Sequence, residues 1–571
     1  MRRWLLFAVG IVLIAAGSLL ASRIQTADGV RVSDVRFAGS NGARMSALLY
    51  VPPNASAATP APGILAIHGY INSRETQDGF AIEFARRGYV VLALDQTGHG
   101  FSTPPAFANG FGGPDGLKYL RSLPFVDKVN IGLEGHSLGG AAVLLAAHQY
   151  PDDYKALILV GSTTSPPAAG TATFPRNAAF ILGQYDEFTP VMWGNPAFVQ
   201  PTPGQQNFLA RDVGVSTKLK AIFATADTVV TDRTYGDIAR GNARRLYLPA
   251  VSHPGEHVST EAIGDATDWF ARTLKGGTPR PAGDQIWYWK EFGTLAAFAG
   301  FIALLLGAFD VLLALPLFAS LRRPHAPLRT VRDRGWWTAL LAAILISGLG
   351  YFPLMILGGL IPTNALLSQS ITTEVAVWAL GTALITVLLR RLLKARDAVF
   401  TTEWLPSLLI ALGVVCIGYL SLVVVSGVFQ TDYRFWIVAL KPMTLWQFGA
   451  FLVYLPAFAA YYLLTFRAMH SDLAVNGESR LAQYATAKTA MAGGIFLIVA
   501  ADYVPLFASG RLLLPFDPLH PIIAIQFVAI LAIVALIAVY TYRRTNSYVP
   551  GALISALFVT WYVTVGTATM V

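Results

Sequence analysis

The chain has 571 residues, of which 54% are hydrophobic and only 13% are charged. So apolar a composition excludes a single soluble globule. The net charge of +9 would fit a nucleic-acid partner, but the basic residues fall mostly at the ends of apolar runs, which indicates membrane topology. We therefore expect a lipid bilayer and no nucleic acid as a partner. The single cysteine, Cys416, excludes a disulfide framework, a cysteine-based zinc site and a cysteine nucleophile.

An apolar run from about Trp4 to Ala21 follows the basic start Met1-Arg-Arg. This pattern fits either an uncleaved membrane anchor or a signal peptide. The residues up to Ser22 lack a small-x-small cleavage site, which favours an anchor over residues 1–25. Either interpretation places the following residues outside the cytoplasm.

Residues 26 to about 285 have an ordinary soluble composition, in which apolar strand patterns alternate with helical ones. The expected strands are 35–37, 45–51, 63–68, 89–95, 129–133, 154–160, 177–182 and 245–249. The expected helices are 75–87, one closing at 118–123, 140–148 and one ending at 269–274. Strands and helices that alternate at this spacing favour an α/β fold with a mostly parallel, doubly wound sheet.

Residues Gly135 to Gly139 read Gly-His-Ser-Leu-Gly, which matches the G-x-S-x-G pattern of a nucleophile elbow. In such an elbow a strand turns sharply into a helix and exposes the hydroxyl of the serine, here Ser137. The glycines allow the strained turn and the close approach of strand and helix. The pattern alone is weak, but here it lies between an expected strand and an expected helix, as the motif requires.

These residues resemble those of the α/β-hydrolase superfamily, close to its serine aminopeptidase-like and dienelactone hydrolase-like branches. The resemblance covers roughly residues 30 to 275 and does not extend to the C-terminal half. It rests on four motifs, His68-Gly69, Asp95 to Ser102 (Asp-Gln-Thr-Gly-His-Gly-Phe-Ser), Gly135 to Gly140, and Gly183 to Asp186.

In this family the nucleophile is followed along the chain by an acid and then by a histidine, which implies a catalytic triad here. Ser137 is the nucleophile, its alternative role being a helix N-cap. Asp186 lies where the family places its acid, and the alternatives are Glu187 and Asp227.

Two histidines follow the last expected strand. His253 comes directly after it and is the expected base, and His257 is the alternative. The oxyanion hole implied by the fold uses two backbone amides, those of Leu138 and Tyr70, since fixed dipoles stabilise developing charge without reorganising. No nucleotide loop or metal-ligand pattern is found in the sequence, so no cofactor and no metal are expected.

About 55 residues separate Glu187 from the last expected strand, more than one helix needs. Trp193, Phe198 and Phe208 in this insert would either line an acyl pocket or rest on a membrane, or else the insert packs on the sheet edge as an extra strand and helix. The alternatives stay open at this point.

From about Phe292 the composition becomes that of membrane helices. Eight apolar runs long enough to span a bilayer are expected at 292–321, 335–361, 372–393, 404–427, 443–465, 482–507, 520–541 and 548–570. With the N-terminus inside, the cytoplasmic loops carry Arg322, Arg323, Arg329, Arg332, Arg334, Arg390, Arg391, Lys394, Arg396, Arg467, Arg480, Arg543 and Arg544. The opposite loops carry only Arg434, Lys441 and Arg511. This bias predicts nine spans, with the hydrolase domain and the C-terminus outside.

Three acidic residues, Asp310, Glu374 and Asp502, fall in or near the ends of these runs. Burying an acidic residue in a bilayer costs free energy, so such a residue indicates either a lipid or proton path or an internal pair with another polar group. We favour internal pairs, because the acids form no ordered series.

The expected domains are therefore residues 1–25 as anchor, 26–285 as α/β-hydrolase domain and 286–571 as a polytopic membrane domain of about eight helices. The function expected is a serine hydrolase of the plasma (inner) membrane that faces the extracytoplasmic side and cleaves an ester, thioester or amide through an acyl-enzyme. Its substrate would be a small-molecule or lipid-like acyl compound. The alternatives are an acyltransferase that uses the same triad, and a transporter or sensor in which the hydrolase fold only binds a ligand.

Overall fold

The computed structural model describes residues 4–194, 207–515 and 517–571. Within them the chain divides into two compact units. The sheet unit consists of residues 19–293, 502–518 and 568–571, and the helical unit consists of residues up to 18, 294–501 and 519–567. Two short segments from the C-terminal half of the sequence thus belong to the sheet unit.

The sheet unit is built on a nine-stranded sheet, counted over the described residues, with the strand order β1-β2-β4-β3-β5-β6-β7-β9-β8. Its strands are β1 (Arg31–Ala38), β2 (Arg44–Val51), β3 (Ala61–Ile67), β4 (Val90–Asp95), β5 (Val126–His136), β6 (Ala156–Val160), β7 (Ala178–Ile181), β8 (Thr234–Tyr235) and β9 (Arg244–Tyr247). The strands β4, β3, β5, β6, β7 and β9 run parallel, while β1, β2 and β8 add antiparallel pairs at the two ends. The predicted mostly parallel sheet is confirmed.

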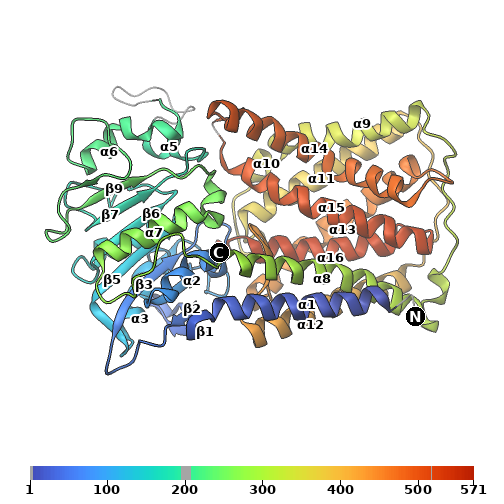
Figure 1. The fold of residues 1–571 in the computed structure, drawn as a ribbon. Coiled ribbons are helices and arrows are strands. Elements are labelled where there is room, and N and C mark those ends of the chain that lie inside the picture. Colours follow the sequence, from blue (N-terminus) through green and yellow to red (C-terminus); the bar gives the residue numbers. More distant parts are fainter. Residues whose placement is uncertain (1–3, 195–206, 516) are drawn as a thin grey trace. The chain divides into compact units, whose positions relative to one another are not determined.

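Helices cover both faces of this sheet, as Figure 1 shows. They are α2 (Asp78–Arg86) and α7 (Thr260–Thr273) on one face, and α3 (Gly113–Ser122) and α4 (Leu138–Gln149) on the other. Successive residues of β3 point to opposite sides, so Leu65 and Ile67 join the core under α3 and α4, while Ile64 and Ala66 join the core under α2 and α7. Burial on both faces explains why the strands read as continuous apolar runs.

The insert between β7 and β9 packs on the sheet edge. It contains α5 (Thr189–Trp193), α6 (Thr217–Ile222) and β8, which pairs with β9. Trp193 and Phe208 are buried in the core, and the ring of Trp193 meets that of Phe180 at a centroid distance of 5.5 Å. The described part of the insert is therefore an addition to the core rather than a membrane-facing surface, and Phe198 lies outside the described residues.

The helical unit contains long apolar helices. They are α8 (Tyr288–Leu313), α9 (Arg334–Leu349), α10 (Tyr351–Gly359), α11 (Ser370–Leu392), α12 (Trp404–Phe429), α13 (Leu445–Leu473), α14 (Arg480–Ser509), α15 (Leu519–Thr545) and α16 (Val549–Gly566), together with α1 (Leu5–Gln25) near the start of the chain. With α9 and α10 taken as one span, nine helices among the described residues are long and apolar enough to cross a membrane. These many apolar helices indicate a membrane protein.

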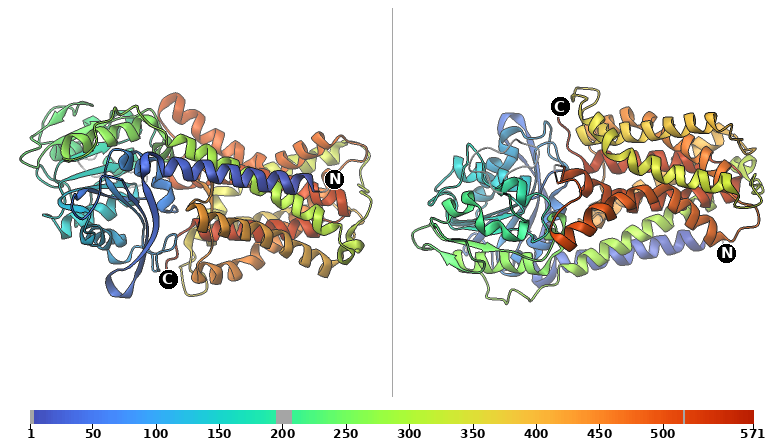
Figure 2. Two further views of the ribbon diagram at one scale, coloured as in Figure 1. Left: turned by 60° about the horizontal axis from the view of Figure 1, so that its bottom comes forward. Right: turned by 90° about the horizontal axis from the view of Figure 1, so that it is seen from above.

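Glycines let α1 pack closely against α8 within the helical unit. A Cβ atom at Gly10 would lie 2.6 Å from the amide nitrogen of Leu304, and one at Gly300 would lie 2.7 Å from that of Ile14. Figures 1 and 2 show α1 and α8 side by side in every view. Close approach at small residues is a usual way for helices to associate in lipid, where apolar burial gives no driving force.

Two of the three acids flagged in the apolar runs have internal partners. Asp310 accepts hydrogen bonds from Arg544 Nε at 2.6 Å and from the hydroxyl of Tyr540 at 2.7 Å. Glu374 lies 3.0 Å from His520 Nε2. Such pairing compensates a charge that would otherwise be exposed to hydrocarbon. A structural role, as predicted, accounts for both acids.

Candidate active site

The carboxyl ends of five neighbouring parallel strands bring the predicted site residues to one edge of the sheet. The registers place Ile67 of β3 beside Gly135 of β5, and His136 beside Val160 of β6. The loops that follow these strands and β7 and β9 carry the predicted residues. Ligands of open parallel α/β sheets bind at this edge.

Ser137 lies at the sharp turn between β5 and α4. Its backbone has φ 52° and ψ −118°, a conformation that a residue with a side chain rarely adopts. The turn is held by the amide of Ser137, which donates to the carbonyl of Val160 at 2.8 Å, and by the hydroxyl of Ser162, which donates to the carbonyl of Ser137 at 2.7 Å. A side chain at Gly139 would collide with the carbonyl oxygen of Ile67. The sequence Gly-x-Ser-x-Gly thus folds into the elbow that its pattern predicts.

Asp186 and His253 form a buried pair. Asp186 Oδ1 lies 3.2 Å from His253 Nδ1, and both residues are at least 95% buried. The carboxylate also accepts hydrogen bonds from the amide of Phe188 at 2.7 Å and from the hydroxyl of Thr189 at 2.9 Å. Burial opposes the charge of each partner, but their mutual attraction prevails, so the pKa of Asp186 is lowered and the pKa of His253 is raised. A carboxylate thus orients one nitrogen of the imidazole ring.

A second carboxylate, Glu187, fixes the backbone of the same histidine. Its Oε2 accepts a hydrogen bond from the amide of His253 at 2.7 Å, and its Oε1 accepts one from the hydroxyl of Tyr503 at 2.6 Å. Burial and the neighbouring charge of Asp186 raise the pKa of Glu187 to about 7. Glu187, considered above as an alternative acid, therefore contacts the backbone of His253 rather than its ring.

The segment that carries Tyr503 belongs to the sheet unit. The ring of Phe507 meets that of Tyr185, two residues before Glu187, at 5.2 Å. Asp502, the third of the flagged acids, is buried and accepts a hydrogen bond from the amide of Leu514 at 3.4 Å. The end of α14 and the following loop therefore pack on the loop that carries Asp186 and Glu187, although the two segments lie far apart in the sequence.

Behind the elbow lies a buried group formed by His136, His253, Glu256 and His257. The ring of His136 lies 4.7 Å from that of His253 and 3.8 Å from that of His257, so His253 approaches the residue that directly precedes Ser137. Burial lowers the pKa of His136 well below and raises the pKa of Glu256 well above its ordinary value, so burial favours the neutral form of each. His257 takes part in this stack and not in the pair with Asp186.

Three of these residues, His136, His253 and Glu256, have potential metal-ligand atoms within 4.8 Å of one another. His136 Nε2 donates to the carbonyl of His253 at 3.2 Å and lies 3.1 Å from Glu256 Oε2, while His253 Nδ1 faces Asp186. Two of the potential ligand atoms, His136 Nε2 and His253 Nδ1, thus already face other polar groups of the protein. No pattern in the sequence indicated this grouping, because 117 residues separate His136 from His253.

The loop after β3 lies against the elbow. A Cβ atom at Gly69 would lie 3.1 Å from the Cβ of Ser137, so the peptide of Gly69 and Tyr70 passes next to the serine. His68 holds this loop through its own Nδ1, 2.7 Å from the carbonyl of Gly69, and through its Nε2, which accepts from the amide of Gln96 at 3.1 Å. Leu138 begins α4, and a first-turn amide has no acceptor within its own helix. The amides predicted for the oxyanion hole, those of Leu138 and Tyr70, thus belong to segments on either side of Ser137.

Of the predicted residues, the structure joins Asp186 to His253 and places the elbow and the loop of Tyr70 side by side. Asp227 is exposed after α6, away from any strand end, so this alternative acid is not supported. Sequence reasoning missed the roles of Tyr503 and Ser162. The only signal for Tyr503 was its place next to an acid in an apolar run.

Comparison with known proteins supports the fold. A family model described as alpha/beta hydrolase fold matches residues 62–190. An uncharacterized protein of Mycobacterium bovis is 36% identical over 128 residues, which is 21% of this chain and 33% of that protein. A monoacylglycerol lipase of Mycolicibacterium smegmatis is 28% identical over 167 residues, which is 28% of this chain and 56% of the lipase. The chain thus spans about a third of the first relative's length and about half of the second's.

Solved structures of hydrolases also match the chain. A CIB-like hydrolase from Thermoplasma acidophilum is 20% identical, with 43% of this chain and 100% of that chain covered and a TM-score of 0.29. A dienelactone hydrolase from Anabaena variabilis is 18% identical, with coverage of 43% and 99% and a TM-score of 0.29. With the family match and the observed sheet order, residues 62–190 are identified as part of an α/β-hydrolase fold, which is followed by many apolar helices.

Proposed function

We propose that this chain is a membrane-anchored serine hydrolase that cleaves an ester, thioester or amide bond through an acyl-enzyme. The fold and the lipase relative support a hydrolase. The observation that carries the finer proposal is the buried Asp186–His253 pair at 3.2 Å, whose histidine ring packs on that of His136, the residue before the serine of a strained elbow. A base oriented by a carboxylate and an exposed serine are the parts that acyl transfer requires.

In the proposed mechanism, Ser137 Oγ attacks the acyl carbon while His253 Nε2 takes the hydroxyl proton. Asp186 holds His253 Nδ1–H and stabilises the imidazolium that forms. The oxyanion accepts hydrogen bonds from the amides of Leu138 and Tyr70. His253 then gives its proton to the leaving group as the bond to the acyl carbon breaks. In the second half of the cycle a water molecule, deprotonated by His253, attacks the acyl carbon, and His253 returns the proton to Ser137 Oγ as its bond to the acyl carbon breaks.

The substrate class proposed is a lipid-like acyl ester. One relative is a monoacylglycerol lipase, and the apolar helices would keep the hydrolase domain near a bilayer, which raises the local concentration of acylated substrates. The arginine-rich loops support a topology with the N-terminus inside and the hydrolase domain on the extracytoplasmic side of the plasma membrane. No cofactor or metal takes part in the proposed reaction.

Hydrolysis of 1-monooleoylglycerol and of p-nitrophenyl esters by the purified full chain in detergent tests this proposal. We expect turnover by the native chain, and a loss on the order of 10³-fold or more in Ser137→Ala. Ser122→Ala, at the exposed end of α3, is the matched control and should leave turnover unchanged. Equal turnover by Ser137→Ala and the native chain would refute the proposed nucleophile.

A further inference from the structure

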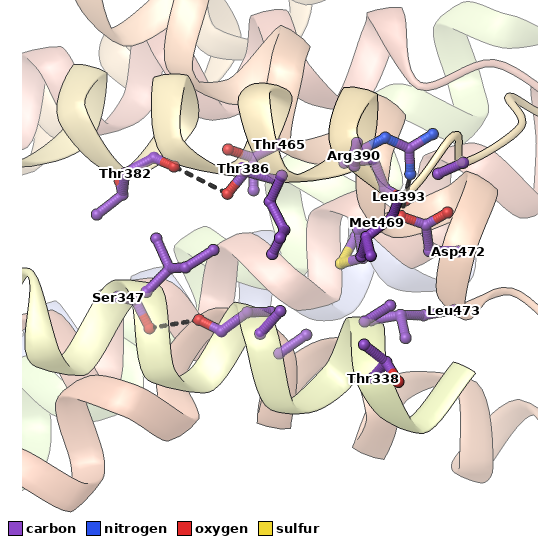
Figure 3. A pocket seen from close by; sticks show the side chains of 18 of the residues that line it. Thr338, Ser347, Thr382, Thr386, Arg390, Leu393, Thr465, Met469, Asp472 and Leu473 are labelled. Atoms are coloured by element: carbon purple, nitrogen blue, oxygen red, sulfur yellow. Dashed lines mark hydrogen bonds and ion pairs between the residues drawn. The ribbon is translucent and has the colours of Figure 1, made fainter. Parts of the chain in front are cut away.

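The helical unit contains a cavity of about 340 Å³ between α9, α11, α13 and α14. Figure 3 shows it lying along these helices, with Ser347 and Thr382 toward one end and Arg390 and Asp472 toward the other. Its volume lies in the range of small-molecule sites, roughly 300–1,000 Å³. The cavity lies wholly within one compact unit and contains none of the proposed catalytic residues.

The walls of the cavity are apolar despite their hydroxyl groups. Thr386 donates its hydroxyl to the carbonyl of Thr382 at 2.8 Å, Ser347 donates to that of Ala343 at 2.8 Å, and Thr338 donates to that of Arg334 at 2.9 Å. Each hydroxyl is thus bonded four residues back in its own helix, which leaves methyl groups and alanines as the main contact surface. Such walls fit an alkyl chain.

The other end of the cavity is charged. Arg390 forms an ion pair with Asp472 and another with Asp397 at 2.8 Å. Arg329, which also lines the cavity, pairs with Asp333 at 2.5 Å. These acids offset the charge of the two lining arginines, so the positive excess at this end comes from the neighbouring residues Arg334, Arg391, Lys394 and Arg396. This end therefore favours an anionic group.

The length of the cavity matches one leaflet of a bilayer. Lining positions run from Thr382 to Arg390 on α11 and from Tyr461 to Asp472 on α13, which corresponds to about 12 to 16 Å at 1.5 Å per residue. Half of a typical hydrocarbon core is about 15 Å. A chain that enters at the charged end would thus reach about the middle of the membrane.

We propose that this cavity binds one alkyl chain of an anionic lipid, whose head group lies at Arg329 and Arg390. The shared chemistry is a carboxylate or phosphate on a long alkyl chain, which both a free fatty acid and an anionic phospholipid provide. The site goes beyond the proposed hydrolase and does not depend on it.

Photolabelling of the purified full chain in detergent tests this site. The probe is a hexadecanoic acid with a terminal diazirine, and the comparison probe is the corresponding alcohol, which lacks the charge. We expect the acid to label peptides within residues 338–347, 382–390 and 461–473, about tenfold more strongly than the alcohol does. Equal labelling by acid and alcohol would overturn the anionic head group.

Variants test the location. Ala343→Phe fills the cavity from α9 and should reduce labelling of these peptides about tenfold, whereas Leu345→Phe, on the exposed face of the same helix, should leave it unchanged. If Ala343→Phe does not fold, Ala490→Leu fills the cavity from α14 instead. Unchanged labelling in the folded cavity variant would refute the site.

Competition distinguishes the two sources of the ligand. If phosphatidylglycerol displaces the probe and phosphatidylcholine does not, the natural ligand is an anionic membrane phospholipid. If only palmitate displaces the probe, the natural ligand is a free fatty acid. Either result supports the site. If all of these lipids displace the probe equally, the cavity is a nonspecific apolar surface, and the proposal is overturned.

Discussion

Glu187→Gln should make the stability of the sheet unit less dependent on pH. Glu187 is buried, and its pKa is raised from 4.5 to about 7 by burial and by Asp186. The folded chain therefore binds this proton more tightly than the unfolded chain does. The corresponding stability is fully present below pH 4.5 and is lost as the pH rises through about 7. A glutamine keeps the size of the side chain and one acceptor oxygen, and it has no proton to lose in this range.

The magnitude follows from the two pKa values. The gap between 4.5 and about 7 corresponds to about 3 kcal/mol at about 1.36 kcal/mol per pH unit. For a unit of this size, that is a shift in Tm of roughly 6–12 °C. Glutamine has one acceptor oxygen in place of two, so its NH2 group must face one of the two donors, the amide of His253 or the hydroxyl of Tyr503. The lost hydrogen bond lowers the stability by about 1 kcal/mol, and this loss is the same at every pH.

Thermal unfolding of both proteins, followed by intrinsic fluorescence between about pH 4 and pH 8 at one scan rate, measures this difference. The buried acid Glu134, whose pKa is raised by burial and not by Glu187, contributes equally to both proteins and cancels. We expect the decrease in Tm with rising pH to be smaller in Glu187→Gln than in the native chain by roughly 6–12 °C. Asp227→Asn, which removes an exposed carboxylate from the same unit, should match the native chain. Parallel curves for Glu187→Gln and the native chain would refute the assigned environment of Glu187.

Three further substitutions have definite expected outcomes. Asp186→Asn should lower kcat on the order of 10³–10⁴-fold. Because this substitution removes the charge that raises the pKa of His253, the acid limb of the pH profile of kcat/KM should move to lower pH. An acid limb at the native pH would contradict the pairing of Asp186 with His253. Gly139→Ala should abolish activity and soluble folding, since the added methyl group meets the carbonyl of Ile67, and a fully active Gly139→Ala would contradict the elbow geometry. His257→Phe should keep activity within about tenfold, because its ring stacks in the buried group without contacting Asp186, whereas inactivation like that of a triad variant would make His257 the base.

The sheet and the elbow could be predicted because their signals are local. Apolar runs separated by helical patterns predicted the parallel strands, and the glycines around Ser137 predicted the turn that the structure contains. Length and hydropathy alone predicted the apolar helices, because a span needs no particular partner residue.

The contacts around the site could not be predicted, because they join residues far apart in the chain. Tyr503 lies 316 residues after Glu187, and no periodicity connects them. Likewise, the choice between His253 and His257 depends on which ring faces Asp186, and both follow the same strand. The packing of Trp193 and Phe208 in the core was one of three open alternatives, because an apolar residue in an insert fits a core, an acyl pocket or a membrane surface equally well.

The most direct test of the central claim is fluorophosphonate labelling of the purified full chain, read by mass spectrometry of the modified peptide. We expect one adduct on Ser137, which is absent in Ser137→Ala and strongly slowed in His253→Ala but not in His257→Ala. Absence of labelling in a native chain shown to be folded, or an adduct on another serine, would contradict the serine-hydrolase account and favour a ligand-binding role for the hydrolase fold.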